Sequence, residues 1–151
     1  MRYFQSVEEI LEFAAALEEN TKTLANLISK RAISEDIRKM SQQFFIREDE
    51  HINTLDSIKQ STELMSLHKA IGLKIADYSV FSDSPDYENM KYKDILSIAI
   101  KNETACLKLY TRLAKLSTDR IISEQLLALA EEEALHRHVI QKEYDNNVRN
   151  T

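Results

Sequence analysis

The sequence predicts an all-α protein built as one four-helix bundle. Its 151 residues are about the length of a single domain and are enough to bury a core. Only one glycine and one proline occur among abundant Leu, Ile, Ala, Glu and Lys, a composition that supplies few turns and favours helices. Four long segments carry apolar residues at helical spacing. We therefore expect a single domain, 1–151, made of two helical hairpins.

The first hairpin is predicted over residues 6–60. Ser6 and Glu9 have the spacing of a capping box, and an apolar series of helical period continues from there to about Ser29. The polar join SKRAIS then leads to Ser34, which precedes two acidic residues and so marks the start of a second helix. That second helix is predicted to end near Gln60.

The second hairpin is predicted over residues 92–146, with helices at about 92–116 and 119–146 joined by the short segment STD. A crossover at 61–91 separates it from the first hairpin. The only glycine, Gly72, and the only proline, Pro85, both lie in this crossover, where a short helix is expected around 64–75. Short joins make antiparallel helix pairs, and the crossover lets the second pair lie against the first.

Charge and composition exclude several classes of partner and location. The formal net charge of −5 and the absence of a Lys/Arg cluster argue against nucleic acid. No segment approaches the roughly 20 apolar residues of a membrane span. The N-terminal segment MRYFQSVEEILEF lacks the apolar run of a signal peptide, and the single cysteine, Cys106, cannot form an internal disulfide. We expect a soluble cytoplasmic protein that binds neither nucleic acid nor membrane.

Six polar residues occupy positions of the helix stripes that are otherwise apolar. The second helix carries a Glu and a His three residues apart, between Phe44 and Leu55, and the fourth helix repeats this pair between Leu129 and Ile140. The first and third helices each carry one Glu in the same kind of position. The six are Glu18, Glu48, His51, Glu103, Glu133 and His136.

These six residues form two sets with a constant offset of 85 positions, since Glu18 pairs with Glu103, Glu48 with Glu133 and His51 with His136. Surrounding apolar residues follow the same offset, which an internal duplication of a helical hairpin explains with one assumption. At about 1.5 Å per residue, each Glu lies roughly 20 Å from the turn of its hairpin. The six side chains should therefore meet at mid-height in the bundle core.

Four unpaired carboxylates in a core would each cost several kcal/mol or take up protons. A pair of divalent cations removes that cost. One Glu from each of two helices and a Glu-x-x-His from each of the other two is the ligand set of ferritin-like dimetal carboxylate proteins. The sequence therefore predicts two metal ions in the core, and a polar network without metal is the alternative.

The segments LEEN…REDEH and NETACLKLY…EEEALH resemble the two repeats of the rubrerythrin branch of the ferritin-like superfamily. This resemblance covers nearly all of the chain outside the crossover. It implies two iron ions that react with hydrogen peroxide or dioxygen in oxidative-stress defence, a separate rubredoxin-like electron donor and a homodimer. Manganese or zinc could occupy the same ligands.

The resemblance also implies a role for each predicted ligand, and through the metals these six are the predicted catalytic residues. Glu18 and Glu103 would be the terminal carboxylates, Glu48 and Glu133 the bridging ones, and His51 and His136 would supply one imidazole per metal. Two turns after Glu103 lies Tyr110, whose hydroxyl we expect to reach a ligand carboxylate. The acidic neighbours and one further histidine are expected to lie on the solvated surface; they are Glu19, Asp49, Glu50, Glu131, Glu132 and His138.

The sequence departs from the rubrerythrin pattern at two points. Rubrerythrins often carry a further Glu one turn after the third-helix Glu, where this chain has Cys106, and the single cysteine leaves no paired Cys-x-x-Cys motif. The chain thus resembles the rubredoxin-less members, and we expect slower peroxide reduction with metal binding kept. Two other functions stay open: ferroxidase-type iron handling, and a helical interaction module without metal.

Overall fold

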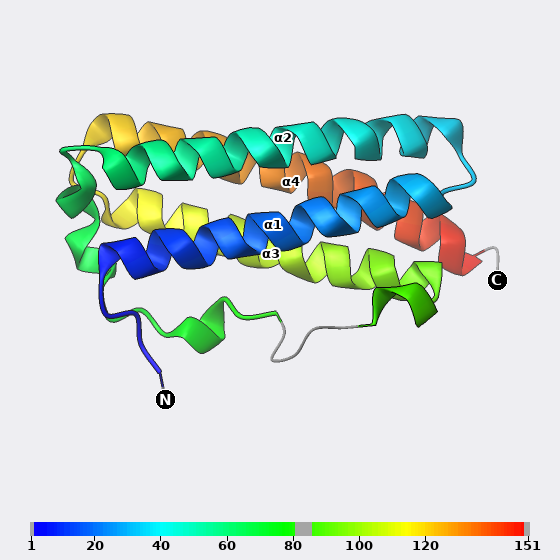
Figure 1. The fold of residues 1–151 in the computed structure, drawn as a ribbon, viewed down its shortest axis with the longest axis horizontal. Coiled ribbons are helices and arrows are strands. Elements are labelled where there is room, and N and C mark those ends of the chain that lie inside the picture. The colour runs from blue at the N-terminus through cyan, green and yellow to red at the C-terminus, as the bar shows by residue number, and fades with distance from the viewer. Residues whose placement is uncertain (1, 81–85, 150–151) are drawn as a thin grey trace.

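The computed structural model describes residues 2–80 and 86–149 and contains four long α-helices (Figure 1). Three short 3-10 helices lie in the crossover: η1 (Leu64–Ala70), η2 (Ile75–Asp77) and η3 (Tyr87–Asn89). The predicted all-α bundle of two antiparallel hairpins is confirmed. The long helices are α1 (Val7–Arg31), α2 (Glu35–Gln60), α3 (Tyr92–Leu116) and α4 (Arg120–Arg149).

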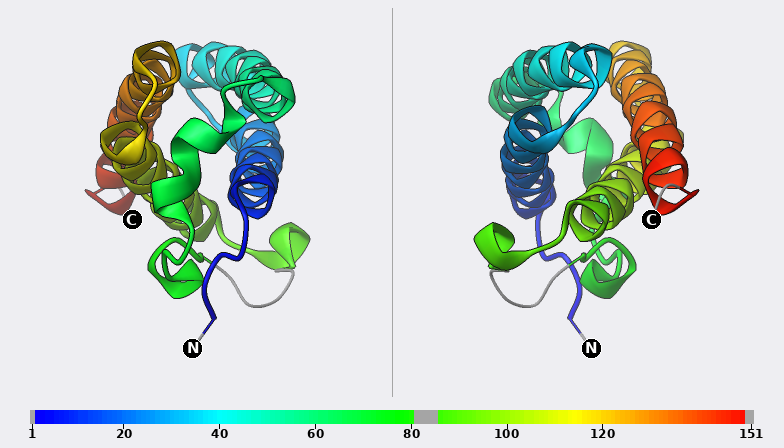
Figure 2. Two further views of the ribbon diagram at one scale, coloured as in Figure 1. Left: turned by 90° about the vertical axis from the view of Figure 1, so that its left-hand side faces the viewer. Right: turned by 90° about the vertical axis from the view of Figure 1, so that its right-hand side faces the viewer.

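The four long helices surround a common core, as the end views show (Figure 2). Helix α1 packs along α2 and α3 packs along α4, so each hairpin forms one side of the bundle. The two hairpins meet mainly through α1 and α3, and less extensively through α2 and α4. Every helix therefore contributes one face to the same interior.

The starts of α1, α2 and α4 carry side-chain caps. Ser6 Oγ accepts a hydrogen bond from the backbone N–H of Glu9 at 3.1 Å, and Ser34 Oγ accepts one from Ile37 at 3.4 Å. At the start of α4, a carboxylate oxygen of Asp119 accepts from the N–H of Ile122 at 2.9 Å. These caps satisfy backbone donors that the first helical turn leaves unpaired.

The crossover is held at both ends of the bundle and runs along its α1–α3 side (Figures 1 and 2). At one end, η1 packs on α1, α2 and α3, and the N–H of Thr118 donates to the carbonyl of Ser66 at 2.9 Å. At the other end, the guanidinium of Arg31 donates to the carbonyls of Met90 and Tyr87. The short helix expected around 64–75 is present as η1, which starts at Leu64 as predicted but ends at Ala70, because the chain turns at Gly72, which has a φ of 94°.

The core consists of two apolar clusters with a polar layer between them. One cluster is centred on Leu11, Leu55 and Leu109, and the other on Leu24, Ile28 and Ile95. All six predicted ligand residues fall between these clusters in sequence on their helices, which agrees with the expected mid-height position. Among the described residues, no helix is both long and apolar enough to cross a bilayer.

Gly72 gives a test of the crossover turn. An added Cβ would meet no atom within 4 Å, so the cost of Gly72→Ala arises from the left-handed backbone alone, about 1–2 kcal/mol. Gly72→Asn should cost less, because asparagine tolerates this conformation better. Urea denaturation of the three proteins measures both effects, and an unchanged midpoint for Gly72→Ala would contradict the assigned turn.

Candidate metal centre

The structure brings all six predicted ligand residues together in the middle of the bundle. Each of them is at most 6% exposed. Their ligand atoms form two groups of four, within each of which all atoms lie within 4.8 Å of one another. One group contains Glu18 and His51, the other contains Glu103 and His136, and Glu48 and Glu133 belong to both.

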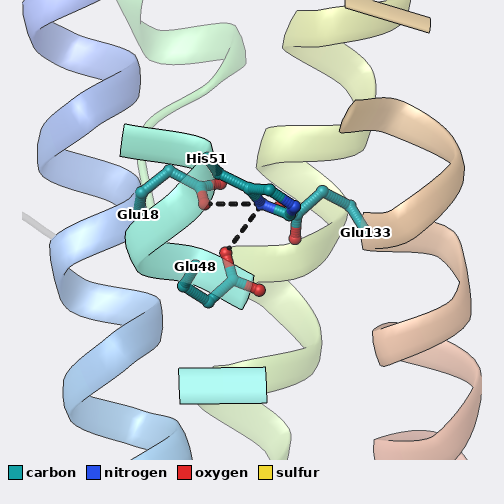
Figure 3. Close-up of side chains that lie close together, drawn as sticks. All are labelled: Glu18, Glu48, His51 and Glu133. Carbon is teal, nitrogen blue, oxygen red and sulfur yellow. Dashed lines mark hydrogen bonds and ion pairs between the residues drawn. The ribbon is translucent and has the colours of Figure 1, made fainter. Parts of the chain in front are cut away.

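The ring of His51 lies among three carboxylates that come from three helices (Figure 3). Its Nδ1 is 3.0 Å from Glu18 Oε2, 3.2 Å from Glu48 Oε2 and 2.8 Å from Glu133 Oε1. One ring nitrogen carries at most one proton, so it cannot donate to all three oxygens. Several oxygens and a nitrogen that converge in this way suit a shared cation better than a proton.

His136 faces the centre in the same manner from α4. Its Nδ1 is 2.7 Å from Glu48 Oε1, and its ring is nearly parallel to that of His51, with 6.1 Å between the centroids. The His136 ring also stacks on the ring of Phe44, with 4.1 Å between the centroids. Both histidines therefore direct Nδ1 toward the carboxylates.

Two carboxylate oxygens in the cluster lack a partner. Within the described residues, Glu103 Oε2 and Glu133 Oε2 are buried and accept no hydrogen bond. A buried polar atom left in this state costs free energy, and a bound cation would remove the cost. The donor set of four carboxylates and two imidazoles is chemically suited to iron or manganese. The residues present thus fit a pair of divalent cations.

Comparison with known proteins supports the architecture. No protein-family model and no curated protein sequence matches the chain. A solved structure from Thermotoga maritima, provisionally described as a ferritin-like diiron-carboxylate protein, superposes with a TM-score of 0.81 over 97% of this chain and 99% of that chain, at 19% identity. The fold is ferritin-like. At this identity the similarity establishes the fold alone, and the rubrerythrin branch stays a prediction.

In the ferritin-like bundle without metal, the cluster holds protons that cations would displace. Burial raises the pKa of Glu18, and the charge of Glu133 raises it further. Burial also raises the pKa of Glu133, although a hydrogen bond with His51 opposes this. Burial by itself would lower the pKa of His51, but hydrogen bonds to Glu133, Glu18 and Glu48 raise it far above its usual value.

Glu48 shows the opposite behaviour. Burial would raise its pKa, but hydrogen bonds with Glu18, His136 and His51 hold the pKa well below the usual range. Glu48 therefore favours its ionised form, whereas Glu18, Glu133 and His51 favour their protonated forms. A carboxylate that stays negative at the centre of the cluster gives an arriving cation an immediate partner.

Tyr110 and Cys106 lie against the cluster from α3. The Tyr110 hydroxyl donates to Glu18 Oε1 at 3.0 Å, which is the contact with a ligand carboxylate that we expected. Cys106 is fully buried, and burial together with the charge of Glu18 raises the pKa of its thiol. The thiol is thus neutral and fills space as a small apolar group.

The expectation for Glu132 was wrong. Its carboxylate contacts His51 Nε2 and also pairs with Arg47, and its side chain is only 29% exposed. Sequence reasoning missed this because Glu132 precedes a predicted ligand, Glu133, and was assigned to the solvated face. One signal was present: Glu132 is offset by 85 from Arg47, so equivalent positions of the two hairpins carry opposite charges. The other residues expected at the surface are exposed: Glu19, Asp49, Glu50, Glu131 and His138.

These pKa directions predict how the metal-free protein responds to pH. The pKa values of three groups in the cluster are raised in the folded state: those of Glu18, Glu133 and His51. In the unfolded chain the same groups lose their protons at their lower, usual pKa values. Their contribution to stability is therefore fully present below the usual pKa values of these groups, and it decreases as the pH rises above them, from about pH 5 through pH 8 and beyond. The melting temperature of the chelator-treated protein should fall by several degrees over this range.

Metal should reverse the trend, because ligation needs ionised carboxylates and neutral imidazoles. The gain in melting temperature on adding Mn²⁺ should be larger at about pH 8 than at about pH 5.5. Glu18→Gln tests the source of this dependence, since it removes a carboxyl whose pKa is raised and leaves the surface charges in place. Its slope should be smaller, and an equal slope would show that Glu18 does not contribute to the pH dependence.

Proposed function

We propose that this ferritin-like protein holds two iron ions and is an oxidoreductase that reduces hydrogen peroxide or reacts with dioxygen. The observation that carries the proposal is the pair of overlapping ligand groups that share Glu48 and Glu133. Two shared carboxylates, with one further carboxylate and one imidazole on each side, suit two ions held close together. Manganese or zinc could take the same positions.

The proposal gives each residue a task. Glu18 and His51 would hold one ion, Glu103 and His136 the other, and Glu48 and Glu133 would bridge them. The four carboxylates offset the charge of two divalent ions, so the complete centre is close to neutral inside an apolar core. Burial of all six ligands keeps bulk water from the centre.

The reaction needs electrons as well as a site. Reduction of hydrogen peroxide to two water molecules consumes two electrons and two protons, and it breaks the oxygen–oxygen bond. Iron, when bound, would supply the redox chemistry by cycling between its ferrous and ferric states. Tyr110 keeps Glu18 oriented through its hydroxyl hydrogen bond, and a separate rubredoxin-like protein would return the electrons.

Turnover with an electron donor tests the function. The di-ferrous protein should reduce successive equivalents of peroxide when a reduced rubredoxin is supplied, and donor oxidation followed by absorbance measures this. Iron uptake well beyond two ions per chain would instead favour a ferroxidase-type role. Failure to bind iron or manganese would leave the helical interaction module.

The metal content tests the site. The protein purified anaerobically with excess iron should contain two ions per chain, and Glu48→Ala or Glu133→Ala should lose at least one, since each removes a ligand common to both groups. Glu19→Ala is the matched control, because Glu19 is an exposed glutamate next to a ligand. Elemental analysis gives the count, and retention of both ions in both variants would refute the assignment.

We expect Cys106 to limit the rate at which peroxide oxidises the di-ferrous protein. In Cys106→Glu a carboxylate would stand beside the cluster, one turn beyond Glu103, and oxidation of the di-ferrous protein by peroxide should become faster, on the order of tenfold. Cys106→Ser keeps the size of the side chain without adding a carboxylate and should react like the native protein. Stopped-flow absorbance measures the rates. A Cys106→Glu protein that binds two irons and reacts no faster would show that this position does not limit the chemistry.

A further inference from the structure

The two halves of the candidate centre have the same ligands but different surroundings. Residues offset by 85 occupy equivalent positions in the two hairpins. The contacts of Glu18 and His51 can therefore be compared directly with those of Glu103 and His136. Any difference between them is a difference between the two predicted metal positions.

The two histidines differ in the contacts of Nε2, the ring nitrogen that does not face the carboxylate cluster. His51 Nε2, which points away from the carboxylate cluster, contacts the carboxylate of Glu132, and Arg47 in turn holds Glu132. A carboxylate that accepts from this N–H fixes the ring and leaves Nδ1 free as a ligand.

His136 lacks such a partner, because the residue equivalent to Glu132 is Arg47, which cannot accept a hydrogen bond. Within the described residues no hydrogen bond reaches His136 Nε2, and the ring is held by stacking on Phe44. Stacking restrains the plane of the ring but does not select its protonation state.

The terminal carboxylates, Glu18 and Glu103, also differ in whether a hydrogen bond holds them. Glu18 Oε1 accepts from the Tyr110 hydroxyl at 3.0 Å, so one oxygen is anchored. The residue equivalent to Tyr110 is Ala25, which offers no donor to Glu103. Glu103 Oε2 is buried without a partner among the described residues. Both ligands of one position are thus held from outside, and both ligands of the other lack a hydrogen bond of this kind.

We propose that the two metal positions are unequal, with the tighter one at Glu18 and His51, and that Glu132 is the positioning residue that makes it so. The inference rests on the proposed function, since it needs two metal ions. Ligands that are already oriented lose less conformational freedom on binding, and this raises affinity. The position at Glu103 and His136 binds more weakly, and its carboxylate is free to change orientation.

Titration with Co²⁺ tests the inequality. The full-length metal-free protein is titrated anaerobically while heat and visible absorption are recorded. Two steps are expected, separated by at least about tenfold in affinity. His51→Ala should remove the tight step, whereas His136→Ala should keep it and lose the weak one.

Variants of Glu132 test the positioning role. Glu132→Ala should weaken the tight step by roughly 10- to 100-fold and leave the weak step unchanged. Glu132→Gln should recover part of the loss, because its amide oxygen still accepts from the imidazole N–H. Glu131→Ala is the matched control, since it removes the neighbouring exposed glutamate and should bind like the native protein. Circular dichroism establishes that each variant is folded.

Different results overturn the inference and the proposed function. The inference would be refuted if the native protein bound both ions with equal affinity. It would also be refuted if Glu132→Ala lowered the affinity of both steps equally, and in either case the protein would still bind two metal ions. If Glu132→Gln weakened the tight step as much as Glu132→Ala does, the hydrogen bond from His51 would not be the cause of the tighter binding. A native protein that binds no Co²⁺ would refute the proposed function itself, and the inference with it.

Discussion

Four carboxylates and two imidazoles lie between two apolar clusters, and the bundle has to accommodate them. Leucine at these positions would give a more stable core, because charged groups lose hydration when they are buried. The cost is contained by gathering all six into a single layer, where each side chain has polar neighbours. Each of the four helices contributes at least one residue to this layer.

The crossover also bears on this layer. It carries the chain from the end of the bundle where η1 packs to the end near Arg31, where α3 begins. The contacts of η1 with three helices at one end, and of Arg31 with the carbonyls of Met90 and Tyr87 at the other, fix this return path. The alignment of the two hairpins is thus set partly by a segment that lies far from the cluster.

Much of the fold could be predicted because its signals are local. The caps at Ser6 and Ser34 and the helical period of the apolar residues need only a few neighbouring positions to be recognised. The six cluster residues were found by their place in the stripes and their constant offset, which are also properties of sequence. The start of the short crossover helix at Leu64 was also predicted, but its end and its 3-10 geometry were not, since they depend on how the segment docks on the bundle end.

The role of Glu132 could not be predicted for a similar reason. Its environment depends on how α4 lies against α2, and helical period describes only the faces of a single helix. The position next to a ligand suggested solvent, but the contact between the hairpins places its carboxylate on His51. Local sequence patterns do not predict contacts between helices that are far apart in the chain.

The pair formed by Arg47 and Glu132 bears on how such a chain could have arisen. These residues are equivalent in the two hairpins, yet they contact each other, so they lie close to the axis that relates the halves. In a symmetric homodimer of a single hairpin, a residue on that axis meets its own copy, and two arginines or two glutamates would repel. Opposite charges at this place require two hairpins that differ in sequence, as the two halves of this single chain do.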